Sequence, residues 1–590
     1  MASFAGGAMA GTVVRSRVYR AGLLAAAILY PHAASAQQPP SPPSRPEISP
    51  PVPQTTAPRA RLRIDENGAL PRTDCPLASS SLAVDIRHVQ FTGIDGAELD
   101  PGVREALSDI GAPGAQTVAV VCDIRDRANA ALRRAGYIAT VQIPPQTITS
   151  GELRLEVITA RIVEVRIRGD APPYRNEIAA RVERLKSLDP LNERDAERIL
   201  LLAGDIPGLD VQMSLLPAGT RPGEVIGELN LVYRPYSVLA NVNNLGSRQL
   251  GREAAYVRAE VYGLTGAADA TYLGASTTFD FQEQRVVQIG HLTGLGSGGT
   301  NLEGSFLYAW SRPDIGLLDL RSRSLIGGLS IATPLRRTRR QSIGLVGGFE
   351  LIEQRTRIHS GGASAALNRD KLRVAFLRAE AGFRDYRPLG GEAWSLLGSL
   401  EIRQGLDILG ATRTGSFSAG GYTPSRFSGD ASALVVRAHL EGVAAIGPIF
   451  SIAAQGTGQW ANHPLLNFEE FSIGNLTIGR GYDPGSNSAD RAIALRGELR
   501  AKVHDDNKVR VELFGFYDSV WLWNLDPNAV ENGRRLGSWG GGVRALLPGR
   551  ALLEATYAHP EDPPLLIPGA HRAPDRVLLS LTFQFPPGGR

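Results

Sequence analysis

Beyond Tyr236, apolar and polar residues alternate with a period of two, in segments about ten residues long that are separated by Gly, Asn, Asp, Pro and Arg. One such segment is weak evidence, but roughly sixteen follow one another up to Phe585, and that recurrence is typical of a transmembrane β-barrel. Backbone groups that face lipid must all be paired, so we expect the sheet to close. The pattern predicts a sixteen-stranded antiparallel β-barrel over residues 236–585.

Three segments indicate which face of this sheet is wet. The apolar face of segment 491–503 carries Ile493, Leu495, Leu499 and Val503, and that of segment 509–521 carries Val509, Val511, Leu513 and Trp521. The apolar face of segment 576–585 carries Val577, Leu579, Leu581, Phe583 and Phe585. The opposite faces of the first two carry Arg496, Glu498, Arg500 and Lys502, and Arg510, Glu512 and Asp518. A soluble sandwich would not normally place charges in succession on its second face, whereas a water-filled lumen does. We therefore expect these charges to face the lumen.

Two small α/β units precede the predicted barrel. Residues 82–161 run as a strand, two segments with helical spacing and two more strands, and residues 162–235 repeat that order. Each unit has about 75 residues and the organisation β-α-α-β-β, so the pair forms a repeat in architecture without a repeat in letters.

The N-terminal region has the features of an exported protein. Residues 1–36 combine Arg15, Arg17 and Arg20, an apolar run of ten residues and Ala34-Ser35-Ala36, which predicts a cleaved signal peptide. Residues 37–81 are expected to be a linker, because nine prolines within 39–58 disfavour helix and strand. Within it, only residues 60–70 have the composition of a short helix, and no long helix is expected. Residues 586–590 form a short C-terminal tail.

Charge and cysteine content add little about function. Loss of the three arginines of the signal peptide lowers the formal charge from +4 to about +1, so charge gives no sign of nucleic-acid binding. In an oxidising compartment Cys75 and Cys122 can form one disulfide, and two unpaired thiols are the alternative. Two cysteines without a histidine cluster do not make a zinc site.

The sequence does not favour an enzyme. The GxGxxG match at 294–299 lies between two alternating strands with no helix after it, which predicts a turn rather than a dinucleotide site. The chain has no HExxH, Walker A or paired CxxC motif, and its nine histidines are scattered. We expect no metal, nucleotide or other cofactor.

Three local motifs resemble a known family, the TpsB transporters of two-partner secretion (hemolysin secretion/activation type). They are residues 143–157, with Pro-x-Gln and Gly-x-Leu elements, residues 241–251, a polar opening of the first barrel strand, and FSIGNLTIGRGYDPG at 471–485. The resemblance covers about residues 82–585. It implies two POTRA domains in the periplasm and a sixteen-stranded barrel in the outer membrane of a Gram-negative cell.

The resemblance assigns roles to individual residues. It implies that Arg480, Gly481 and Tyr482 form the motif of a loop (471–490) that folds back into the lumen between the eleventh and twelfth strands, and that Arg480 contacts Asp518. A guanidinium can hold a carboxylate bidentately, so this contact could fix the loop. Phe585 resembles the terminal aromatic residue that barrel-assembly machinery reads.

The function that the resemblance implies is the secretion of an unfolded, TpsA-like exoprotein across the outer membrane, whose lipid surrounds the barrel. Two alternatives belong to other classes. An insertion or assembly factor for outer-membrane proteins would usually carry more POTRA domains. A passive porin-like barrel would need neither the two α/β units nor the loop with Arg480.

Overall fold

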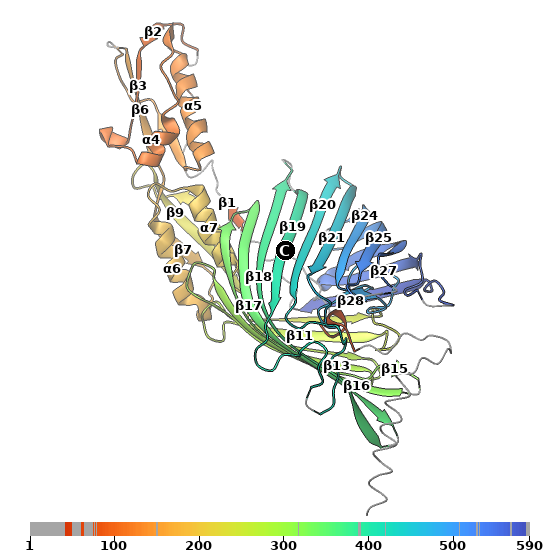
Figure 1. The fold of residues 1–590 in the computed structure, drawn as a ribbon. Helices are drawn as coiled ribbons and strands as arrows, with labels where there is room; N and C mark the ends of the chain where they lie inside the picture. The colour runs from red at the N-terminus through yellow and green to blue at the C-terminus, as the bar shows by residue number, and fades with distance from the viewer. Residues whose placement is uncertain are drawn as a thin grey trace, which may run out of the picture.

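The computed structural model describes residues 42–49, 61–63, 75, 77 and 79–585, apart from 149–150, 317, 361, 388–390, 419, 507, 527–528, 530 and 567–568. The expected signal peptide and the tail 586–590 lie outside the described residues. Two α/β units lead into a large barrel (Figure 1).

The first α/β unit packs two helices on a three-stranded sheet. Its elements are β2 (Ala83–Ile86), β3 (His88–Thr92), the 3-10 turn Ile94–Gly96, α4 (Pro101–Leu107), β4 (Gly114–Thr117), α5 (Val120–Ala135), β5 (Ala139–Gln142) and β6 (Glu152–Thr159). β3 runs parallel to β6 and β5 antiparallel to it, while β2 pairs only with β4. The expected first strand is split in two, because the N–H groups of Arg87 and His88 both donate to the carbonyl of Gly151 at the break.

The second unit repeats this order with longer strands. Its elements are β7 (Arg161–Arg168), the 3-10 turn Pro172–Tyr174, α6 (Arg175–Lys186), α7 (Glu193–Gly204), β8 (Leu209–Pro217) and β9 (Glu224–Tyr233). The side chain of Asn192 caps α7 by accepting the N–H of Arg194. Buried aliphatic residues of both helices, including Ile178 and Leu200, pack onto one face of the sheet and form its core.

The barrel closes from the first strand to the last. Its strands are β10 (Tyr236–Asn243), β11 (Ala254–Tyr262), β12 (Ala270–Thr278), β13 (Gln284–Gly294), β14 (Asn301–Ser311), β16 (Leu318–Arg337), β17 (Gln341–Ser360), β18 (Ala363–Tyr386), β19 (Glu392–Gly405), β20 (Leu434–Ile446), β21 (Phe450–Ala461), β24 (Arg491–Asp505), β25 (Arg510–Trp523), β26 (Arg534–Leu547), β27 (Ala551–Pro560) and β28 (Arg576–Phe585). The two-residue β15 (Asp314–Ile315) pairs with the start of β16, and the 3-10 turn Pro548–Arg550 precedes β27. Each strand is antiparallel to the next, and Val238 of β10 pairs with Phe585 of β28. The expected class, two α/β units and a sixteen-stranded antiparallel barrel, is confirmed.

The second unit docks on turns at one end of the barrel. The Arg337 guanidinium donates two bonds of 2.7 and 2.8 Å to the Asp205 carboxylate at the end of α7. The Tyr174 hydroxyl lies 3.0 and 3.1 Å from the carbonyls of Pro207 and Asp269, and burial raises the pKa of this phenol above its ordinary value. The strands that leave these turns, β12 and β17, therefore run away from the α/β units.

The two faces of the barrel wall divide as the alternation predicts. Ile493, Leu495 and Leu499 of β24 and Leu513 of β25 are exposed on the outer face. Glu498 and Asp518 are buried on the inner face. The wall thus presents an apolar belt outward and charges inward.

The Pro-rich segment is not wholly a linker, contrary to expectation. Residues 45–48 form the short helix α2 (Arg45–Ile48), which begins with a capping box between Ser44 and Glu47. Pro46 lies in the first helical turn, where its missing N–H has no partner to lose, so proline is compatible with this helix. Ile48 is fully buried among inward-facing side chains of the barrel.

The second departure concerns residues 60–70, for which we expected a short helix. Residues 61–63 instead form the strand β1 (Arg61–Arg63), which adds in parallel to the edge of β8. An exposed sheet edge offers unpaired backbone groups to any extended segment, which explains why this stretch takes the extended form. Residues 64–70 lie outside the described part of the chain.

Within the described residues, no helix is both long and apolar enough to cross a membrane.

A disulfide joins Cys75 to Cys122 in α5 and ties the start of the first unit to its longer helix. Closing a loop with a sequence separation of 47 residues removes unfolded-state entropy that corresponds to about 4 kcal/mol. We expect a Cys75→Ser, Cys122→Ser double variant to lose amide hydrogen-exchange protection in α5. Protection in β24 is the internal control and should not change.

Peptide mass spectrometry of the unreduced protein should recover Cys75 linked to Cys122. Two free thiols, or equal α5 protection in the variant and the native chain, would contradict the structural role of this bond.

Candidate functional site

A long loop returns into the barrel between β21 and β24, the eleventh and twelfth strands, where the sequence placed it. Its two arms pair as a short hairpin of β22 (Phe471–Ser472) and β23 (Ser488–Ala489). Buried apolar side chains of the loop, such as Ile478, pack against inward-facing residues of β24, β25 and β26, such as Val520. This packing lays the loop along the inner wall of the barrel.

The tip of the loop is a tight turn around Arg480. Gly479 and Gly481 have φ values of 107° and 92°, a region that side chains strongly disfavour. A Cβ at Gly481 would also lie 2.8 Å from the ring of Pro560. The N–H of Gly481 donates to the side-chain carbonyl of Asn475 at 2.8 Å, which closes the turn.

The backbone of this turn is bound to a single carboxylate of the wall. The N–H groups of Gly479 and Arg480 both donate to Oδ2 of Asp518, at 3.1 and 2.9 Å. Asp518 lies on β25 and is 0% exposed. It is therefore an anchor for the main chain of the loop as well as for side chains.

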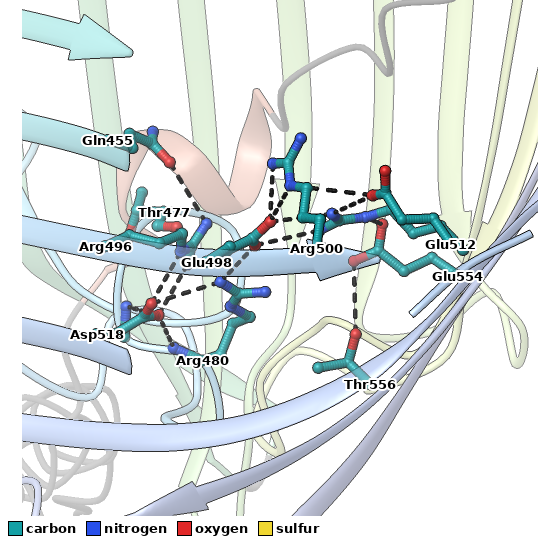
Figure 2. Close-up of polar contacts among 12 residues, drawn as sticks. Gln455, Thr477, Arg480, Arg496, Glu498, Arg500, Glu512, Asp518, Glu554 and Thr556 are labelled. Carbon is teal, nitrogen blue, oxygen red and sulfur yellow. Dashed lines mark hydrogen bonds and ion pairs between the residues drawn. The ribbon is translucent and has the colours of Figure 1, made fainter. Parts of the chain in front are cut away.

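The structure brings Arg480 and Asp518 together, but not through the bidentate contact that the sequence suggested. The Arg480 guanidinium reaches Oδ1 of Asp518 only at 3.5 Å, whereas it donates to Oε1 of Glu498 at 2.8 Å (Figure 2). The bidentate partner of Asp518 is Arg496, which donates from Nε and Nη2 at 2.9 Å each. Arg496 occupies that position because it lies directly opposite Asp518 in the β24–β25 register.

Glu498 is shared by three arginines. Besides Arg480, it accepts from Arg500 at 2.8 Å and from Arg544 of β26 at 3.0 and 3.2 Å. Arg544 also binds Glu554 of β27 at 3.0 Å. Glu512 is more remote, since its carboxylate lies 3.5 Å from Arg544 and 3.9 Å from Arg500.

Two inward-facing phenylalanines support the arginines, and neither was predicted from the sequence. The Arg480 guanidinium lies 3.7 Å from the ring centre of Phe516, and that of Arg544 lies 4.0 Å from the ring centre of Phe514. The rings have space because glycines stand opposite them in the register: Gly540 faces Phe516 and Gly542 faces Phe514. The run Gly540-Gly541-Gly542 within an alternating strand was the signal that could have indicated them.

Tyr482 fixes the other side of the loop tip. Its hydroxyl donates to the carbonyl of Gly537 at 2.8 Å and accepts the N–H of Asp562 at 3.1 Å. The side chain is almost wholly buried. The three motif residues thus contact different parts of the wall: Arg480 contacts β24 and β25, Gly481 lies against β27, and Tyr482 contacts β26.

A second ionic cluster holds the base of the loop. Asp490 accepts two bonds from the Arg426 guanidinium, at 2.6 and 2.9 Å, and also the N–H groups of Leu465 and Leu525 at 2.7 Å. Arg426 binds Glu470 at 2.7 Å as well. Arg426 lies on the loop between β19 and β20, so no local sequence pattern connects it with Asp490.

The segment 42–49 lies inside the barrel beside the loop, a position that its sequence did not predict. Arg45 binds Glu350 of β17 at 2.6 Å, and the backbone carbonyl of Pro42 accepts from the Asn467 amide at 3.0 Å. Arg403 of β19 joins Glu350 to Glu469 of the loop, at 2.6 and 2.8 Å. A proline-rich composition does not encode such a docking site, because most of the contacts belong to the wall.

The remaining predicted residues lie apart from this site. The Cys75–Cys122 bond is in the first α/β unit. Phe585 ends β28 on the outer face, 6.4 Å from the ring of Tyr236 at the start of β10. Among the described residues, no group of three or more His, Cys, Asp or Glu side chains could hold a metal ion.

Comparisons with known proteins agree with the fold. The family described as "Haemolysin secretion/activation protein ShlB/FhaC/HecB" matches residues 230–545. Outer membrane transporter CdiB-2 of Burkholderia pseudomallei (strain 1026b) is 25% identical over 416 residues, which cover 68% of this chain and 67% of that protein.

Two solved structures share the architecture. CdiB from Escherichia coli has a TM-score of 0.67 at 15% identity, covering 88% of this chain and 94% of its own. CdiB from Acinetobacter baumannii has a TM-score of 0.59 at 14% identity, covering 90% and 95%. At these identities the likeness shows the fold.

We expect Asp518→Ala to destabilise the barrel more than Arg480→Ala. The first change leaves Arg496 and two loop N–H groups without their acceptor, a loss of order 3–5 kcal/mol for a fully buried pair. The second leaves Glu498 with Arg500 and Arg544. The measurement is the urea midpoint of unfolding in detergent micelles, followed by tryptophan fluorescence.

Glu554→Ala is the matched control, because it removes a less buried carboxylate from the same network. An Asp518→Ala midpoint no lower than those of Arg480→Ala and Glu554→Ala would show that Asp518 is not the anchor.

Proposed function

The chain belongs to the haemolysin secretion/activation family ShlB/FhaC/HecB, and on that premise we propose that it passes an unfolded exoprotein along its lumen when the Arg480 loop leaves the wall. Proteins of this family are outer-membrane transporters of two-partner secretion. The barrel therefore lies in the outer membrane, and its activity is transport rather than catalysis.

The observation that carries the proposal is the position of the loop. It lies inside the barrel and is bound to the wall through polar contacts of Arg480, Asp518 and Tyr482. Such contacts can be exchanged for water or for polar groups of an extended chain at little net cost. An extended polypeptide that entered the lumen would offer both donors and acceptors to the same wall.

The two α/β units support recognition of cargo as POTRA domains in the periplasm. Sheet edges there, such as that of β5, can accept an added strand from an extended segment through main-chain hydrogen bonds. The second unit is held against the barrel by Arg337 and Tyr174, so cargo bound there would lie at the barrel mouth. Folding of the cargo outside the cell would supply direction without a nucleotide.

Two further partners belong to the same proposal. The apolar outer belt contacts outer-membrane lipid, and barrel-assembly machinery would recognise the last strand through Phe585 during biogenesis.

The alternatives fit less well. An insertion factor would usually carry more POTRA domains than two, and a passive porin has no need of an anchored lumenal loop.

Secretion of a TpsA-like exoprotein that is expressed together with this chain tests the proposal. We expect Arg480→Ala to change the amount in the medium by about tenfold, because loss of this anchor shifts the equilibrium between the bound and the released loop by ~1.4 kcal/mol. Deletion of residues 82–235 should abolish export, because the cargo loses its periplasmic binding surface. Immunoblots of medium and periplasm provide the measurement.

Arg510→Ala is the control, since this arginine is exposed at the end of β25 and pairs only with Asp505 among the described residues. The amount of heat-modifiable barrel in the outer membrane must match between variants, so that failed assembly is not mistaken for failed export. Unchanged export by both the Arg480 variant and the deletion would refute the proposal.

A further inference from the structure

A row of arginines crosses the outer face of the barrel between β13 and β18. Arg285 of β13 pairs in register with Trp310 of β14, and Trp310 pairs with Arg323 of β16. Arg323 then pairs with Arg355 of β17, and Arg355 with Arg369 of β18. We call Arg285, Arg323, Arg355 and Arg369 the arginine row.

The alternation of burial shows that this row points away from the lumen. The neighbours of its members along each strand are buried inward, among them Val286, Ser324 and Gln354. Side chains of a strand alternate between faces, so the arginines lie on the outer wall.

Most of the arginine row has no partner among the residues that the structure describes. In the part of the chain that the structure describes, no hydrogen bond or ion pair involves the side chains of Arg285, Arg323 or Arg355. Arg369 binds Glu353 at 3.0 Å, but Arg373 takes the same carboxylate at 3.0 Å. Like charges directly opposite on neighbouring strands destabilise a sheet. A bound anion would therefore stabilise this row by offsetting the repulsion between its arginines.

The arginine row stands at the rim of the apolar belt. After Arg285, the next two outward-facing residues of β13 are Val287, which is 41% exposed, and Ile289, which is 50% exposed. Leu329 of β16, which is 56% exposed, continues the belt. Val287 follows Arg285 by two residues, which is ~6.8 Å along the strand, so the apolar surface begins directly beside the arginine row. The rings of Tyr308 and Trp310, 4.6 Å apart, cover this border as an aromatic girdle does at a membrane interface.

The rim in question faces the outside of the cell. The second α/β unit contacts the turn between β13 and β14 through Leu202 and Gly299, and the turn between β16 and β17 through Asp205 and Arg337. The arginine row lies toward the opposite ends of these strands, near β15, which Figure 1 places far from the α/β units. It therefore lies at the height of the headgroups of the outer leaflet.

We propose that the arginine row binds the phosphate groups of a phosphorylated glycolipid in the outer leaflet of the outer membrane. Guanidinium groups bind phosphate oxygens through paired, charge-assisted hydrogen bonds. Acyl chains of the same molecule lie along Val287, Ile289 and Leu329, so one ligand meets both the charge and the apolar surface. A soluble anion could meet only the charge.

The test uses the full-length protein in detergent micelles with a bis-phosphorylated glucosamine-disaccharide lipid as the probe. Native mass spectrometry measures the bound lipid. We expect the native chain to retain this lipid. A triple variant with Arg285→Gln, Arg323→Gln and Arg355→Gln should bind it at least about tenfold more weakly. The matched control replaces Arg87, Arg154 and Arg166, exposed arginines of the α/β units, and should bind as the native chain does.

Two further arms distinguish the sources of phosphate. The dephosphorylated form of the same lipid should bind no better to the native chain than to the triple variant. Inorganic phosphate at the same phosphate concentration should not displace the lipid. Equal binding of the phosphorylated lipid by the native chain and the triple variant would overturn the proposal. So would equal affinity of the native chain for the phosphorylated and the dephosphorylated lipid, or displacement of the lipid by free phosphate.

A single variant keeps the test independent of folding losses. Arg323→Glu places a carboxylate opposite Arg355, which should raise the thermal midpoint in lipid-free micelles because an opposite pair replaces a like pair. The same variant should lose glycolipid binding. A lower midpoint, or glycolipid binding equal to that of the native chain, would contradict the assignment.

Discussion

Asp518 is the carboxylate on which the lumenal arrangement depends. A buried charge requires both an opposite charge and hydrogen-bond donors. Here Arg496 supplies the charge from the neighbouring strand, and the main chain at Gly479 and Arg480 supplies two further donors from the loop. One side chain therefore satisfies the wall and positions the loop at once, and the glycines on either side of Arg480 are needed because the turn must bring two successive N–H groups to one oxygen.

The sequence was sufficient for the barrel, because strand periodicity is local. Each strand must alternate to separate lipid from lumen, so Ile493 and Glu498 could be assigned to opposite faces from spacing alone. The two α/β units were predictable for a related reason, since their helical and strand periods differ clearly. The placement of Arg480 on a returning loop came from a family motif rather than from periodicity.

The partners within the lumen could not be predicted in the same way. Which carboxylate meets Arg480 depends on how deep the loop lies and on the register of strands that are adjacent in space, and neither quantity has a local signature. That is why Asp518 was expected as the main partner although Glu498 makes the shorter contact. The docking of Arg45 on Glu350 was missed for the same reason, because only the closed barrel brings residues 305 positions apart together.

The carboxylates of the wall do not need the loop in order to stay paired. Asp518 keeps Arg496, and Glu498 keeps Arg500 and Arg544, when only strand residues are counted. The loop tip adds the guanidinium of Arg480, two N–H groups and a stacking contact with Phe516. Its departure therefore exposes no unpaired wall carboxylate, and the cost lies in desolvated groups of the loop, which water or an extended polypeptide can satisfy. A loop anchored in this way is held firmly at rest, yet the lumen behind it is already prepared for a polar chain.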